Sequence, residues 1–343
     1  MIPVLNCGSQ SIKWKIFDGD LRLLRERKIE VKNQKDFKEI LAKELKQIES
    51  HYREPFSIVG HRVVHGGEKF REPIKITNKI LKELKKFNSL APLHNPFNIL
   101  GIEIAQKIFP KVKQIAVFDT GFFKDLPKKA FIYALPEKLT KKYGFRRFGF
   151  HGISHEYVAR KAAKKIGKPY KKLKIITCHL GGGSSITAIK FGKAVDTSMG
   201  FTPMEGLIMM TRPGDIDPGI ILEMVKDKLP LENILNYQSG IKGICGLSDM
   251  KSVLKSAARN KKEAKLALEI FCYRLQKYIG AYFAVLGGCD VLVFTGMIGF
   301  GSKKIRDMIC KDLDILKNTK ILAIETDEEL AIAEKIKSMI KLK

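Results

Sequence analysis

Two arginines lie in glycine-rich turns and could bind an anionic substrate. Arg62 stands in GHRVVHGGE, at the end of an expected strand, and Arg212 stands in MMTRPGDIDPG. A lone surface arginine most often forms a salt bridge of little consequence, but a structural role is harder to assign within such turns. Two guanidinium groups can bind a carboxylate and neutralise a transferring phosphoryl group through paired hydrogen bonds. The pair therefore points to chemistry on acidic substrates.

Histidine and aspartate residues are candidates for the rest of this chemistry. His151 lies between Phe150 and Gly152, a position that suits a hydrogen-bond donor to a developing anion. Asp119, in VFDTGF, ends an expected buried strand, and α/β folds place ligands at the C-terminal ends of such strands. Four further histidines have different expected roles. We expect His94 and His179 to belong to the site, and His65 and His155 to be structural residues.

Two similar turns, each between two apolar strands, suggest phosphate binding. LNCGSQSIKWKIF and CHLGGGSSITAIKF both consist of a strand, a Gly/Ser turn and a returning strand with a lysine. Glycines let backbone N–H groups converge on an anion, and serine hydroxyls add donors. One such turn is weak evidence, but two copies indicate an internal duplication. Paired phosphate hairpins in duplicated halves resemble the superfamily of sugar kinases, Hsp70 and actin.

Hydrophobic periodicity predicts the elements that must position these residues. The 343 residues suffice for two domains with large cores. In the first half we expect strands at 2–6, 11–17, 57–64 and 113–120, and helices at 36–51, 78–87 and 98–108. In the second half we expect a strand at 173–180 with a returning hairpin, helices at 219–227, 230–237 and 261–285, and a strand at 289–296.

Charge and cysteine content limit the classes of function. The net charge is +27, but the lysines are spread along expected helix faces and no nucleic-acid-binding motif accompanies them. The six cysteines are far apart and show no metal-ligand spacing, and no signal segment opens the chain. The most apolar region, 278–300, is broken by Gly287, Gly288 and Asp290. We therefore expect a soluble, cytoplasmic protein that binds neither nucleic acid nor a membrane.

Eight segments in order make the resemblance specific. The chain resembles the acetate kinase family across nearly its whole length, in the stretches LNCGSQSIK, GHRVVHGGE, APLHNPFNILGI, VFDTGF, FGFHGISHEYV, HLGGGSS, TRPGDIDPG and ETDEELAIA. The resemblance implies reversible transfer of a phosphoryl group from ATP to acetate, giving acetyl phosphate and ADP, with Mg²⁺ (or Mn²⁺) on the nucleotide. It also implies a homodimer.

The same resemblance implies a fold and domain limits. The fold would be α/β, with duplicated actin-like (ribonuclease H-like) domains and the nucleotide cleft between them. The first domain would comprise 1–122 plus a closing C-terminal helix at 330–343. The second, 123–329, would hold nucleotide-binding and dimer surfaces.

Roles carry over position by position from the family. The catalytic set would be Arg62, His94, Asp119, His151 and Arg212. The acetate methyl pocket beside Arg62 would be formed by Val64, Leu93, Phe150 and Pro203, and Asn6 and Glu328 would serve the metal. The nucleotide would contact Ser9, Ser11, Lys13, His179, Leu180, Gly181, Gly182, Gly183, Asp249, Met297, Gly299 and Gly301.

Departures from the family lie near the base of the nucleotide. The family usually has asparagine at the position of Gly182, and a GGIGEN segment where this chain reads GMIGFG. Met297 and Phe300 are therefore larger and more apolar than their counterparts, and Gly301 lacks a side-chain amide. The chain is also shorter than usual, between 18 and 57 and after 301. We expect weak discrimination between nucleotide bases.

Three alternatives stay open. A propionate or butyrate kinase of the same family is the nearest, because one methylene in an apolar pocket changes binding by only about 1 to 3 kcal/mol. A nucleotide-binding regulatory homologue with impaired catalysis is favoured by the altered base segment and opposed by the retained Arg62, Asp119, His151 and Arg212. A nucleic-acid-binding protein is supported by charge alone.

Overall fold

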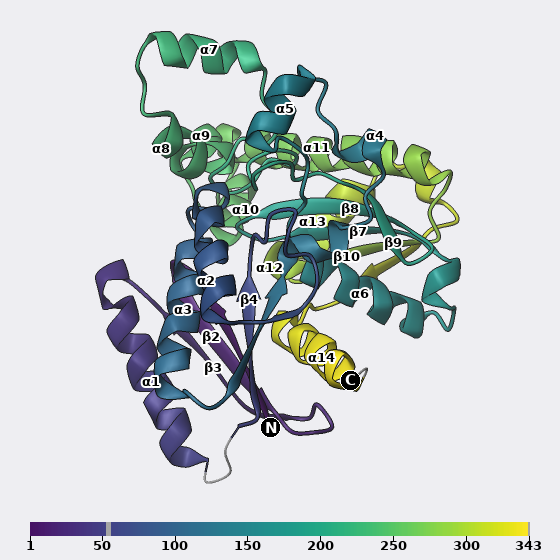
Figure 1. The fold of residues 1–343 in the computed structure, drawn as a ribbon. Coiled ribbons are helices and arrows are strands. Elements are labelled where there is room, and N and C mark those ends of the chain that lie inside the picture. Colours follow the sequence, from purple (N-terminus) through teal and green to yellow (C-terminus); the bar gives the residue numbers. More distant parts are fainter. Residues whose placement is uncertain (53–55, 342–343) are drawn as a thin grey trace. The chain divides into compact units, whose positions relative to one another are not determined.

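The chain forms two α/β units, each built around one mixed sheet (Figure 1). The computed structural model describes residues 1–52 and 56–341. Unit 1 comprises Met1–Lys124, His151–Ser154 and Asp327–Lys343, and unit 2 comprises Asp125–Phe150 and His155–Thr326. The α/β class expected from the sequence is confirmed.

The sheet of unit 1 begins with the predicted hairpin. Its strand order is β3-β2-β1-β4-β6-β5, with β1 antiparallel to β2 and parallel to β4. The strands are β1 (Ile2–Cys7), β2 (Ser11–Phe17), β3 (Leu23–Glu30), β4 (Ile58–Val63), β5 (Ile74–Lys75) and β6 (Lys113–Phe118). Every residue of β1 is buried, because helices cover both faces of the sheet at this strand.

Helices α1 and α3 lie on one face of this sheet and α14 lies on the other (Figure 1). The helices of unit 1 are α1 (Phe37–His51), α2 (Asn78–Leu84), α3 (Asn95–Ile108) and α14 (Glu328–Lys341). Helix α3 begins three residues before its predicted start because Pro96 is compatible with the first turn. The predicted helix at 78–87 ends earlier, at Leu84, and continues as a 3₁₀ helix over Lys85–Leu90.

The sheet of unit 2 repeats this topology. Its order is β11-β10-β7-β8-β9, so each unit has its first three strands antiparallel and two further strands parallel to the first. The strands are β7 (Lys174–Leu180), β8 (Ser184–Lys190), β9 (Lys193–Thr197), β10 (Val291–Thr295) and β11 (Lys320–Ala323). The strand β5 at the edge of unit 1 has no counterpart in the described part of unit 2. The internal duplication inferred from the two hairpins is confirmed.

Helix α11 packs on one face of this second sheet, and α6 contacts the other through His155 (Figure 1). The remaining helices are α4 (Lys128–Phe131), α5 (Glu137–Tyr143), α6 (Gly152–Lys165), α7 (Pro218–Lys226), α8 (Leu231–Asn233), α9 (Gly240–Cys245), α10 (Met250–Ala258), α11 (Lys262–Leu286), α12 (Gly296–Gly299) and α13 (Lys303–Cys310). The predicted helix at 230–237 is instead the short α8 followed by a π-helical turn. None of the helices in residues 1–52 and 56–341 is long and apolar enough to span a bilayer.

Candidate active site

Arg62 and Asp119 form a bidentate ion pair at one edge of the sheet of unit 1. Parallel pairing of β4 with β6 aligns Arg62 with Val117, so both strands end together. Arg62 Nη2 lies 2.6 Å from Asp119 Oδ2, and Arg62 Nε donates to Asp119 Oδ1 at 3.2 Å. The Asp119 side chain is buried. The geometry fixes the plane of the guanidinium group, as bidentate pairs do.

The first residues of α14 and the end of β1 complete this cluster. Arg62 Nη1 lies 3.0 Å from Glu328 Oε2 and donates to Asn6 Oδ1 at 3.2 Å. The Asn6 amide Nδ2 donates to Glu328 Oε2 at 3.3 Å and to Glu329 Oε1 at 2.8 Å. The structure thus brings together four residues predicted from the sequence, and adds Glu329. In the sequence, Glu329 directly follows Glu328 in TDEE, and this pair of adjacent acids is the feature that could have indicated the fifth residue.

Charge in this cluster is unbalanced. Burial alone would lower the pKa of Arg62, but the carboxylates of Asp119, Glu328 and Glu329 raise it. Burial raises the pKa of Asp119 against the opposing effect of Arg62. Burial and the neighbouring Glu328 raise the pKa of Glu329. Three carboxyl groups face one guanidinium, with Lys13 as a second cation near Glu329, so the cluster can accept a further positive charge.

The donor atoms of this cluster fit Mg²⁺. This ion prefers oxygen ligands and is usually bound by one or two carboxylates together with phosphates and water. Asn6 and Glu328 offer an amide oxygen and a carboxylate within hydrogen-bonding distance of each other's side chains. Over residues 1–52 and 56–341, no cluster of three His, Cys, Asp or Glu side chains could hold a metal by itself. Phosphate oxygens and water would complete the coordination of a divalent cation held by these two side chains.

The two Gly/Ser turns differ in how far their polar groups are exposed: Ser9 and Ser11 are partly exposed, whereas Ser184 and Ser185 are buried. In unit 1 the turn closes with Gly8 N donating to Ser11 O at 2.9 Å, and the Lys13 side chain is exposed. In unit 2, Gly181 N donates to Gly183 O at 3.0 Å. Leu180 is fully buried, so it can offer a ligand only its backbone.

Arg212, in unit 2, is oriented by a neutral group. Its Nη1 donates to the carbonyl oxygen of Pro203 at 2.6 Å. No carboxylate pairs with it within residues 1–52 and 56–341, and burial lowers the pKa of its guanidinium to about 10. A cation withdrawn from water without a counter-charge is costly. Such a group is suited to receive an anionic substrate.

His151 occupies a strained position next to Asp119. Its backbone has φ +57°, a left-handed conformation that is uncommon for residues other than glycine. A Cβ on the following residue, Gly152, would lie 2.1 Å from the carbonyl oxygen of Asp119. Only glycine allows this approach, and it brings the His151 backbone close to Asp119.

The other histidines differ in their surroundings. His155 is buried, with Nδ1 2.7 Å from Thr177 Oγ1 and Nε2 2.8 Å from Ser185 Oγ. The buried His65 accepts a bond from Gly67 N at 2.9 Å. These two have the structural environments expected of them. His94 is half-buried before the first turn of α3, and the His179 ring lies 6.2 Å from that of His155.

The residues expected to line a methyl pocket are apolar and at least partly buried. Val64 and Leu93 belong to unit 1, where Val64 N donates to Asn98 Oδ1 at 3.0 Å. Phe150 and Pro203 belong to unit 2, and Phe150 is fully buried.

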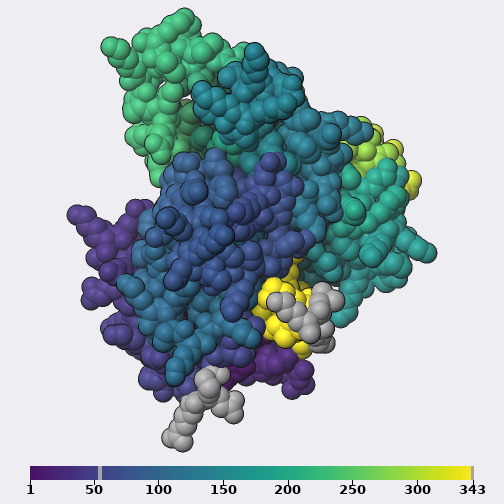
Figure 2. All heavy atoms as spheres, viewed as in Figure 1, coloured from purple at the N-terminus to yellow at the C-terminus, as the bar shows by residue number. Residues whose placement is uncertain are grey.

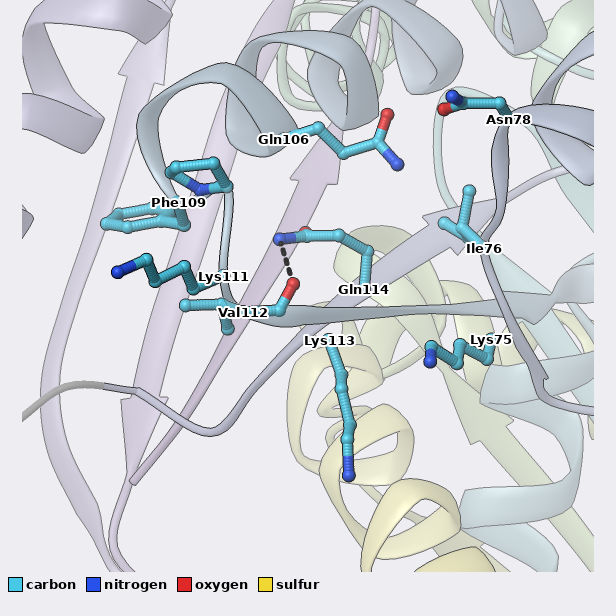
Figure 3. A pocket seen from close by; sticks show the side chains of 10 residues that line it. Lys75, Ile76, Asn78, Gln106, Phe109, Lys111, Val112, Lys113 and Gln114 are labelled. Carbon is cyan, nitrogen blue, oxygen red and sulfur yellow. Dashed lines mark hydrogen bonds between the residues drawn. The ribbon is translucent and has the colours of Figure 1, made fainter.

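A separate pocket lies at the opposite end of β6 from Asp119 (Figure 3). Its volume is about 370 Å³, and Figure 3 shows Gln106, Asn78 and Gln114 around it. Gln114 Nε2 donates to the Val112 carbonyl at 3.1 Å. None of the site residues predicted from the sequence lines this pocket.

Comparison with known proteins covers almost the whole chain. The model of the acetokinase family matches residues 24–340. The chain belongs to the acetokinase family. The acetate kinase of Carboxydothermus hydrogenoformans is 41% identical to it, over 99% of this chain and 99% of the relative.

Solved structures of the acetokinase type share the fold. A Porphyromonas gingivalis acetate kinase superposes with a TM-score of 0.87 at 34% identity, covering 100% of this chain and 99% of its own. A Francisella tularensis propionate kinase gives a TM-score of 0.87 at 39% identity, covering 97% and 98%. The family likeness inferred from the eight motifs is confirmed, as is the duplicated fold expected with it.

The departures from the family pattern differ in their physical basis. A Cβ at Gly182 would meet no atom within 4 Å, so packing does not exclude the asparagine usual in the family. A Cβ at Gly301 would lie 2.4 Å from the carbonyl oxygen of Met297, so a side chain there requires the backbone to move. Met297 is 81% exposed. Asp249, another expected nucleotide contact, accepts a bond from Ser252 N at 2.9 Å and caps α10.

Proposed function

We propose that this chain transfers the γ-phosphoryl group of ATP to acetate, reversibly and in line, giving acetyl phosphate and ADP. The observation that carries the proposal is the match to acetate kinases along the full length of both chains. The geometry supports it independently. Phosphoryl transfer requires positioning and charge neutralisation rather than covalent help, and guanidinium groups supply both.

The two arginines are suited to different tasks. Arg62 is held in a fixed plane by Asp119, which suits orientation of a carboxylate or phosphoryl group. Arg212 has no carboxylate partner in the described chain, so its charge is available to the transferring group. His151 would donate to the developing charge, and His94 would support it. Val64, Leu93, Phe150 and Pro203 would enclose the methyl group.

A divalent cation, Mg²⁺ or Mn²⁺, would be held by Asn6 and Glu328. When bound, it supplies neutralisation of the charge on the nucleotide phosphates. Ser9, Ser11 and Lys13 would bind the phosphates from one hairpin. The turn His179–Gly183 would do so from the other. Asp249, Met297, Gly299 and Gly301 would lie near the nucleoside.

Replacing Glu328 by glutamine should raise the Mg²⁺ concentration needed for half-maximal activity about tenfold or more, because one anionic ligand is lost. Titration of activity with MgCl₂ at saturating nucleotide measures this. Glu334→Gln, at an exposed position of the same helix, is the matched control and should leave the requirement unchanged. An unchanged requirement in Glu328→Gln would exclude Glu328 as a metal ligand.

A hydroxamate assay tests the reaction itself. The protein is incubated with acetate, Mg²⁺ and ATP, GTP, CTP or pyrophosphate in turn, and acyl phosphate is trapped as the hydroxamate. Formation of acetyl phosphate with a nucleotide supports the proposal, and its absence with every nucleotide refutes it. Repeating the assay with propionate and butyrate decides the acceptor. The similarity to a propionate kinase makes propionate the second candidate.

Base discrimination should be weak. We expect kcat/KM for ATP and GTP to lie within about tenfold, or roughly 1.4 kcal/mol, because the segment 296–301 offers few polar side chains to a base. Competition between the two nucleotides measures it. Gly182→Asn is a cleaner variant than Gly301→Asn, since its Cβ has room. A wild type that prefers ATP a hundredfold would contradict the expectation, whatever the variant does.

We also propose that two copies of the chain associate through α7. This helix has no buried residue and exposes Ile220, Leu222 and Val225, at 46%, 63% and 54%. Figure 2 shows this segment, in green, projecting from its unit. Leu222 and Val225, three residues apart, share one face of the helix, and an exposed apolar surface of this kind typically marks a protein interface.

Leu222→Lys should therefore shift the protein from dimer to monomer, because a charge would be buried at the centre of the apolar contact. Sedimentation velocity at matched concentrations measures this. Lys228→Ala, just beyond the helix, should leave the association unchanged. A wild-type monomer would refute the proposal.

A further inference from the structure

A cluster of polar side chains surrounds Glu205 in unit 2. Arg147 Nη2 lies 2.5 Å from Glu205 Oε1, and the Tyr133 hydroxyl donates to Glu205 Oε2. Glu205 is 58 residues from Arg147 and 72 from Tyr133 in the sequence, and the Arg147 side chain is only 17% exposed. Burial and Glu205 raise the pKa of Tyr133, so its hydroxyl remains a donor over the working pH range.

Arg147 and Tyr133 also form hydrogen bonds with the backbone between β9 and Glu205. Arg147 Nη1 donates to the carbonyl oxygens of Thr197 and Ser198, at 3.0 and 2.9 Å. The Tyr133 oxygen accepts from Phe201 N at 2.9 Å. A Cβ at Gly200 would lie 1.6 Å from Glu205 Oε2, so the chain passes the carboxylate at a distance that only glycine permits.

The same stretch of backbone contains the carbonyl group of Pro203, which orients Arg212. Pro203, two residues before Glu205, provides the carbonyl oxygen that accepts from Arg212 Nη1 at 2.6 Å. The segment beyond Glu205 is fixed as well. Gly206 N donates to Asp215 Oδ1 at 2.8 Å, and the Tyr278 hydroxyl donates to Asp215 Oδ2 at 2.7 Å.

We propose that Glu205, held by Arg147 and Tyr133, is a positioning residue that sets the orientation of Arg212 through the Pro203 carbonyl. The arrangement has an electrostatic reason. A carboxylate placed directly on Arg212 would neutralise its charge and compete with an anionic substrate. Here the carboxylate is neutralised by Arg147, and a neutral carbonyl holds Arg212 in place with its charge available.

The inference rests on the proposed phosphoryl transfer, and two conservative variants test it. Glu205→Gln keeps the size of the side chain and removes its charge, whereas Tyr133→Phe removes the hydroxyl that joins Glu205 to Phe201 N. We expect each to lower kcat about 10- to 100-fold, because small displacements of a catalytic group have effects of that order. The KM for ATP should change less than about threefold. The exposed Glu269→Gln is the control, with unchanged kcat.

A double-mutant cycle separates positioning from a general loss of structure. In an Arg212→Lys background, Glu205→Gln should cost less than about twofold in kcat, since the geometry it supports has already been lost. An equal cost in both backgrounds, or a normal kcat in both single variants of an active wild type, would overturn the inference. A wild type that forms no acyl phosphate would instead refute the proposed function.

Discussion

Replacing Arg212 by alanine should lower kcat about 10²- to 10³-fold without lowering the thermal midpoint of unfolding. In comparable enzymes, loss of a charged hydrogen-bond donor to the transition state raises the activation free energy by several kcal/mol. Stability should not fall, because the guanidinium has no carboxylate partner in the described chain and its burial already lowers its pKa to about 10. Removing a buried charge without a partner relieves a desolvation cost.

Steady-state kinetics and a thermal melt on the same preparation measure both effects. Arg259→Ala, at an exposed position after α10, is the matched control and should be neutral in both. Arg212→Lys keeps the charge but not the planar fork, so its kcat should lie between those of the wild type and the alanine variant. An alanine variant with normal kcat and a raised KM would show that Arg212 binds substrate and transition state equally.

Strong periodicity made most of the fold predictable. The buried strands β1, β4, β6, β7 and β10 all lie where apolar runs end in a Gly, Ser, Asp or Thr turn. The repeated hairpin indicates the duplication from the sequence alone, since both copies keep their strand, turn and strand.

Elements without an apolar pattern were missed. The strand β3 is LLRERKIE, with nearly every residue exposed, and its pairing with β2 decides its conformation. Charges on such an edge strand prevent further pairing, which is why its sequence does not alternate. Helix α6 was missed because glycine and histidine open it, and the contacts of His155 with the sheet stabilise it.

Candidate residues whose own side-chain chemistry suggests a role can be proposed from the sequence, whereas a residue proposed to act through another cannot. Arg62, Asp119 and Arg212 stand at strand ends or in glycine-rich turns, and their side-chain chemistry suggests a role. Glu205 bonds to Arg147 and Tyr133, 58 and 72 residues away in the sequence. No local motif encodes such pairing, so only the tertiary structure reveals it.

Replacing Arg62 by alanine should, in contrast to Arg212, lower both the rate and the stability. Its removal leaves Asp119, Glu328 and Glu329 near one another without a guanidinium group. Breaking a buried ion pair from one side costs about 3 to 5 kcal/mol, and kcat should fall at least about 10²-fold with the lost stabilisation of the phosphoryl group. Thermal melts and steady-state kinetics of the two arginine variants, run in parallel, measure the contrast.

The pH dependence of this instability has a definite sign. Without Arg62, the pKa values of Asp119 and Glu329 in the folded protein should rise further above their unfolded values, because burial and the neighbouring carboxylate Glu328 raise them and the guanidinium no longer opposes this. Groups with raised pKa values bind protons more tightly when folded, so the stability deficit should be largest near pH 8 and shrink towards pH 5. The double variant Arg62→Ala/Asp119→Ala removes one of the uncompensated carboxylates and should regain part of the lost midpoint while remaining inactive. A deficit that grows on acidification, or a single variant as stable as the wild type, would show that Arg62 does not balance the charge of this cluster.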